Sequence, residues 1–69
     1  MATVSYTIRV TGPMRPGLVD DFDGVREVEQ APHTMLHADL ADAAALHGLL
    51  HALRRAGLEL LEVRREPTR

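Results

Sequence analysis

The sequence contains no cysteine, no lysine and no tryptophan, and its aromatic residues are limited to Tyr6 and Phe22. The absence of cysteine excludes disulfide bonds, thiolate metal ligands and a cysteine nucleophile. It also fits a cytoplasmic protein, which is the location we expect. The scarcity of aromatic rings argues against a surface on which single-stranded nucleic acid stacks its bases. The core must therefore be built from aliphatic side chains and methionine.

The chain also lacks a strong charge of one sign and a long hydrophobic run. Its formal net charge is −2, so no overall field attracts nucleic acid or acidic lipid. No apolar stretch approaches the roughly 20 residues of a membrane-spanning helix, and residues 1–10 lack the pattern of a signal peptide. We therefore expect no nucleic-acid partner and no membrane partner. The eight basic residues are all arginine, which is typical of a GC-rich bacterial genome.

The length of 69 residues is enough for one domain, which we place at residues 1–66, followed by a frayed tail over residues 67–69. A chain this short buries only about 60% of the surface that its unfolded form exposes. Small domains of this kind often gain stability from disulfides, metals or self-association. Since disulfides are excluded, self-association as a homodimer is the route we favour, and four histidines leave metal binding open.

Alternation of apolar and polar residues predicts strands. It is regular over residues 3–11 and 33–40 and is also present over 58–65, where we expect Leu61 and Val63 to face the core. Residues 25–30 give a weaker pattern, which indicates a late start or a β-bulge. The two middle strands are close enough in sequence to form a hairpin.

Helical spacing occurs in two segments. Residues 42–56 carry a leucine stripe at positions i, i+3, i+4 and i+7 and are followed by Gly57, the expected residue after a helix C-terminus. Asp39 or Asp42 can cap the start of this helix. Residues 16–23 predict a short helix that ends at Gly24. If they form a loop instead, a three-stranded sheet with one helix is the alternative.

The resulting order β-α-β-β-α-β predicts an α+β fold, a ferredoxin-like sandwich with a four-stranded antiparallel sheet and a very short first helix. Both helices would cover one face of the sheet. The first strand and the strand over residues 33–40 would lie in the middle. The opposite face would be open to solvent.

The expected open face is mostly polar, with Met35 and Leu60 as apolar spots. Apolar spots with a polar rim are typical of association surfaces, although an ordinary solvated sheet face is the alternative. The face would present Ser5, Thr7, Arg9, Thr11, His33, Met35, His37, Asp39, Leu60, Glu62 and Arg64. From these we select Arg9, Met35, His37 and Leu60 as the candidate interface, for a second copy of the chain or for an unidentified protein partner.

The histidines offer limited chemistry. His47 and His51 are four residues apart on one helix face and could chelate a metal, but no carboxylate ligand accompanies them. His33 and His37 are roughly 13 Å apart along a strand, too far to share one ion. His37 and Asp39 could act in acid–base chemistry, but no nucleophile pattern accompanies them. We therefore predict no enzymatic activity, no cofactor and no metal site.

Residues 44–50 and 57–65, together with the initial pattern Tyr6-x-Ile8-x-Val10, resemble a group of small uncharacterised actinobacterial proteins. That group has no assigned activity, so the resemblance implies no site residues. At the level of the fold, the chain also resembles ACT-like regulatory domains, but it lacks their glycine-rich ligand turn. We predict a small accessory domain that self-associates. The alternative is a regulatory module that binds a small ligand or metal through its histidines.

Overall fold

The computed structural model describes residues 3–12, 14–30 and 32–67. Its elements are β1 (Val4–Thr11), β2 (Val25–Glu29), β3 (Thr34–Leu40), α1 (Ala43–Arg55) and β4 (Glu59–Arg65). The four strands form one sheet in the order β2-β3-β1-β4, and all neighbouring strands are antiparallel. The α+β class, the four-stranded antiparallel sheet and the central position of β1 and β3 are confirmed. Of the expected tail, residues 68–69 lie outside the described residues.

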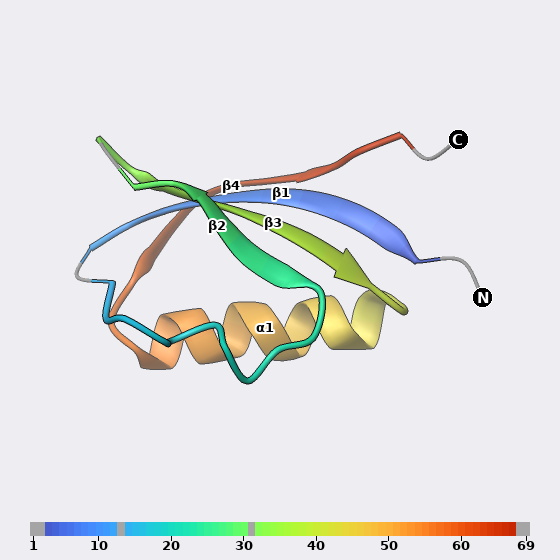
Figure 1. Cartoon of the computed structure of the whole chain (residues 1–69), viewed down its shortest axis with the longest axis horizontal. Coiled ribbons are helices and arrows are strands. Elements are labelled where there is room, and N and C mark those ends of the chain that lie inside the picture. Colours follow the sequence, from blue (N-terminus) through green and yellow to red (C-terminus); the bar gives the residue numbers. More distant parts are fainter. Residues whose placement is uncertain (1–2, 13, 31, 68–69) are drawn as a thin grey trace.

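The helix and a turn segment, which we define as residues 14–24, lie on the same side of the sheet (Figure 1). Helix α1 packs against β3 and β4. The turn segment contributes Val19, which is buried, and Met14 and Phe22, which pack against the core. The other side of the sheet is covered by no element of the described chain (Figure 1). We call this side the open face.

Both ends of α1 follow from local sequence. The carboxylate of Asp42 accepts a hydrogen bond from the Ala45 amide at 2.9 Å, which satisfies a free N–H of the first turn. At the other end, Gly57 has a positive φ of 89°, and the Leu58 amide bonds back to the Leu53 carbonyl at 3.2 Å. This pairing, together with the burial of both leucines, forms a Schellman ending. The prediction of this helix and of Gly57 as its stop is confirmed.

The predicted short helix over residues 16–23 is wrong. The turn segment forms successive turns, with amide-to-carbonyl bonds three residues apart, such as Asp20 to Gly17 at 3.1 Å and Phe22 to Val19 at 3.1 Å. Gly17 has φ +81°, a left-handed conformation that a right-handed helix cannot include. Leu18, Val19 and Phe22 therefore pack in or against the core from a series of turns, although their spacing is that of a helix. The described residues form one helix and four strands, so neither the two-helix form nor the three-stranded alternative is correct.

The core lies between the sheet and the layer formed by α1 and the turn segment. Ile8, Leu36 and Leu49 are fully buried at its centre, one each from β1, β3 and α1. The other buried apolar residues are Val10, Val19, Ala38, Leu40, Leu53 and Leu58. This is the aliphatic core that the scarcity of aromatic residues predicts. Both aromatic rings lie at its margin, where Tyr6 and Phe22 are half-buried.

Each edge strand contains a bulge. In β2 the register shifts between Glu27 and Glu29, which leaves Val28 unpaired, as the broken alternation predicts. In β4 the register shifts after Leu60, and Leu61 is the extra residue. Val28 and Leu61 are the exposed large apolar residues of the described chain, with 49% and 44% of their surface accessible.

The bulge in β4 reverses part of the predicted orientation. Leu60 pairs with Val10, a buried residue, and packs against the core. Leu61 was expected to face the core and is instead exposed. The placement of Leu60 on the open face is therefore wrong, whereas the inward orientation of Val63 is confirmed because it pairs with Ile8 and packs against the core.

Candidate functional site

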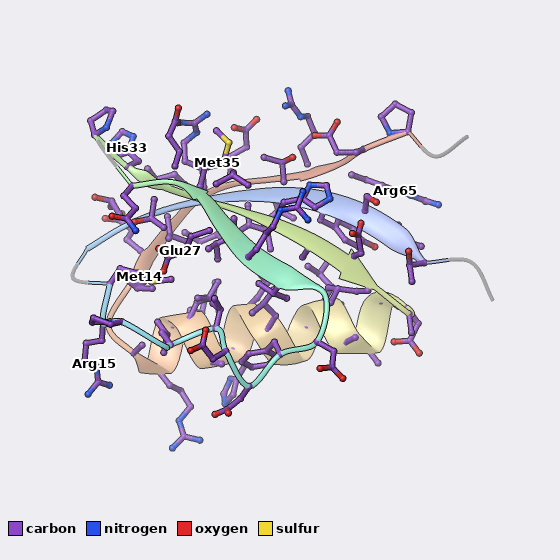
Figure 2. All side chains as sticks on the ribbon, viewed as in Figure 1. Met14, Arg15, Glu27, His33, Met35 and Arg65 are labelled. Carbon is purple, nitrogen blue, oxygen red and sulfur yellow. The ribbon has the colours of Figure 1, made fainter. Side chains whose placement is uncertain are left out.

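The open face brings together three of the four candidate interface residues. Arg9 on β1 is the direct cross-strand partner of Met35 on β3, and His37 lies two residues further along β3, opposite Thr7. Met35 and His37 are half-buried. Figure 2 shows Met35 and His33 on the open side of the sheet and Glu27 and Met14 on the opposite side. Leu60 does not join this group.

Register defines three transverse rows of side chains on the open face. The first row runs from β2 to β4 through Glu29, Met35, Arg9 and Glu62; the second runs through Arg26, His37, Thr7 and Arg64. The third contains Asp39 and Ser5. Glu66 lies beside them because its backbone N–H donates a hydrogen bond to the Ser5 carbonyl. We call these the methionine row, the histidine row and the aspartate row. The sequence analysis did not place Arg26 and Glu29 of β2 on the open face, because the alternation of apolar and polar residues in this strand is broken.

Asp39 is the acceptor at the centre of a small polar network. Its Oδ1 accepts a hydrogen bond from Ser5 Oγ at 2.5 Å and lies 3.2 Å from His37 Nε2. The Ser5 hydroxyl, followed by the His37 charge, holds the pKa of Asp39 below its usual value. Because the Ser5 hydroxyl donates its hydrogen bond to a carboxylate, it is not activated by an imidazole as a nucleophile would be. The geometry is that of a stabilised carboxylate.

Glu66 forms a second network beside the first. Its Oε2 accepts a hydrogen bond from Thr7 Oγ1 at 2.7 Å and from Arg64 Nε at 3.1 Å. The Thr7 hydroxyl, followed by Arg64, lowers the pKa of Glu66. A looser ion pair joins Arg9 to Glu62 at 3.7 Å in the methionine row. These contacts order the polar side chains around Met35.

The two histidines of α1 are separate from this face. His47 and His51 are exposed on α1, on the far side of the core. Within residues 3–12, 14–30 and 32–67, no three histidine, aspartate or glutamate side chains are grouped closely enough to hold a metal ion. In the same residues, no helix is long and apolar enough to cross a membrane.

Two grooves lie on the covered side of the sheet, and sequence reasoning missed both. One, of about 620 Å³, lies between the turn segment and β2; its lining includes Met14, Val19, Glu27 and Thr34. The other, of about 710 Å³, is mainly apolar and lies between Phe22 and the first turns of α1, close to Gly48. Each groove is lined by residues from separate segments of the chain, so no pattern along a single segment predicts it.

A family model for a domain of unknown function, DUF8691, matches residues 5–64. This chain belongs to the DUF8691 family. The match begins at Ser5 in β1 and ends at Arg64 in β4, so it includes all of β2, β3 and α1 and every residue of the methionine and histidine rows. The resemblance to small uncharacterised proteins is thereby confirmed, and the actinobacterial origin stays a prediction. No curated protein and no solved structure matches the chain.

Proposed function

We propose that this DUF8691 domain is a non-enzymatic accessory module that forms a homodimer through the open face of its sheet. The observation that carries the proposal is the uncovered face itself. Met35 lies on it, half-buried, next to Arg9, in a chain whose core is small. Apolar surface surrounded by polar groups is typical of an association site. A second copy would supply the layer that the sheet lacks.

The geometry favours the face over the sheet edges as the dimer contact. An intermolecular sheet would require β2 or β4 to pair along its free edge. Both strands carry bulges, at Val28 and Leu61, and bulges and charged side chains protect edges against such pairing. The polar networks around Asp39 and Glu66, in contrast, fix side chains on the face before any partner arrives. Fewer side chains therefore have to be ordered on association.

The non-enzymatic part of the proposal is supported by Ser5, whose hydroxyl donates its hydrogen bond to the Asp39 carboxylate and not to an imidazole. We also infer that the fold is a ferredoxin-like arrangement without its first helix. The strand order and the helical connection from β3 to β4 support that interpretation. A cytoplasmic location fits the absence of cysteine.

Sedimentation equilibrium from micromolar to millimolar protein tests the proposal. We expect a reversible dimer whose dissociation constant rises at least about tenfold in Met35→Arg, because this change buries a second cation beside Arg9. His47→Arg adds a cation to the exposed face of α1 and serves as the matched control. A wild-type chain that is monomeric throughout this range would refute the proposed function.

A further inference from the structure

The charges on the open face determine how two copies can align. The methionine row has acidic ends, Glu29 on β2 and Glu62 on β4. The histidine row has basic ends, Arg26 on β2 and Arg64 on β4. Neighbouring rows are two residues apart along β3, β1 and β4, which is roughly 7 Å. On β2 the bulge makes the spacing three residues, from Arg26 to Glu29. At both edges of the sheet, an acidic end of one row therefore lies beside a basic end of the other.

Two copies stacked face to face around a two-fold axis can be aligned in only a few ways. An axis parallel to the strands places β2 over β4 of the partner and each row over itself. Glu29 would then oppose Glu62 of the second copy, and Arg26 would oppose Arg64. Like charges placed opposite one another weaken association, so this alignment is unfavourable. An axis across the strands and directly over the histidine row is also unfavourable, because it sets Arg26 against its own copy.

An axis across the strands that lies between the methionine and histidine rows removes these conflicts. It places each methionine row over the histidine row of the other copy. Glu29 then meets Arg26, Glu62 meets Arg64, and Met35 meets His37, each pair occurring twice. We propose that the partner of the open face is a second copy of this chain, held in this register by reciprocal Glu29–Arg26 and Glu62–Arg64 pairs. The inference rests on the proposed function and adds the alignment of the two copies.

The pair on β2 is the best available contact for a test. Both Arg26 and Glu29 are exposed, and within the described part of the chain neither takes part in an ion pair. Glu62 and Arg64, in contrast, already have partners in Arg9 and Glu66. A charge reversal on β2 should therefore change association with little effect on the folded monomer.

The area of the face indicates a weak dimer. With strands about 4.8 Å apart and a rise of about 3.3 Å per residue, the face measures roughly 19 Å by 23 Å, on the order of 440 Å². A standard stable interface buries about 800 Å² on each partner. The alignment of opposite charges governs specificity and association rate more than affinity. It therefore contributes a larger share of the specificity of this small interface than it would in a large apolar one. We also expect added salt to weaken the dimer.

The experiment uses two full-length variants, Arg26→Glu and Glu29→Arg, singly and as an equimolar mixture. In the proposed register, each variant alone sets like charges against one another, whereas the mixed dimer restores opposite charges in both pairs. We expect each variant alone to raise the dissociation constant at least about tenfold, and the mixture to return to within about threefold of wild type. Arg15→Glu is the control for Arg26→Glu, because it makes the same change in net charge on the turn segment (Figure 2).

A second measurement reports the alignment directly. The chain has no cysteine, so introduced thiols are the only ones present. We expect Met35→Cys mixed with His37→Cys to form mainly the mixed disulfide dimer under mild oxidation. If Arg26→Glu and Glu29→Arg each dimerise like wild type, or if the mixture of these two variants stays monomeric, the proposed register is wrong, although the homodimer itself is not refuted. If wild type itself is monomeric, the proposed function fails and the register fails with it.

Discussion

Three glycine-to-alanine substitutions should have three different effects on stability, and together they test the packing of the turn segment against the sheet. Gly24 has φ +81° and its carbonyl accepts a hydrogen bond from the Asp39 amide at 2.8 Å. A Cβ at Gly24 would overlap the backbone carbonyl oxygen of Asp39, an atom held in the central strand β3. Gly57 also has a positive φ, but a Cβ there meets no atom within 4 Å.

The magnitudes follow from these differences. A left-handed alanine costs about 1–2 kcal/mol, which we expect for Gly57→Ala. Gly24→Ala adds a backbone overlap to the same strain, so we expect a loss of about 3 kcal/mol or more. Gly48 lies inside α1 with no atom within 4 Å of a Cβ. Gly48→Ala should therefore stabilise the fold by about 0.8–1 kcal/mol through helix propensity alone.

Urea unfolding followed by circular dichroism, at a fixed protein concentration, gives the free energy of unfolding for each variant. In a domain of this size, 1 kcal/mol corresponds to roughly 4–8 °C in Tm, so the three variants separate clearly in a thermal scan as well. The predicted order is Gly48→Ala, wild type, Gly57→Ala and then Gly24→Ala, from most to least stable. If Gly24→Ala were no less stable than Gly57→Ala, the close approach of the turn segment to β3 would be refuted.

Two further predictions concern the polar contacts. Asp42→Ala should cost about 1 kcal/mol, because it removes the side chain that caps α1, and thermal unfolding measures this loss. Ser5→Ala should raise the pKa of Asp39 toward its usual value, which carboxyl NMR titration reports, whereas Thr7→Ala should leave it unchanged. Since the folded pKa of Asp39 is lowered, its contribution to stability is present above the unfolded value of 3.8 and is lost as the pH falls through the folded pKa. The stability difference between Ser5→Ala and wild type should therefore shrink at strongly acidic pH, and a difference that stayed constant would contradict this origin.

Local signals predicted local features well. Asp42 and Gly57 act within one turn of the helix, so their effect does not depend on the rest of the chain. The regular alternation in β1 and β3 likewise determined which side chains of these strands face the core. In these places propensity, pattern and packing agree, and the sequence alone was sufficient.

The errors arose where the backbone departs from regular geometry. The pattern of Leu18, Val19 and Phe22 is helical, yet Gly17 adopts a left-handed conformation that single-sequence patterns do not reveal. In β4, the bulge at Leu61 reverses which alternate residues face the core. The two adjacent leucines, Leu60 and Leu61, break the alternation at this point and were the sign of the bulge that the sequence offered. The charge rows required the register between strands, which no single-strand pattern supplies.

The central claim is that the open face pairs with a second copy, and sedimentation equilibrium of wild type beside Met35→Arg is its most direct test. The account predicts a concentration-dependent dimer for wild type and for the His47→Arg control. For Met35→Arg it predicts a dissociation constant at least about tenfold higher than that of wild type, with an unchanged circular dichroism spectrum. A wild-type monomer up to millimolar concentration, or a Met35→Arg dimer as tight as wild type, would contradict it.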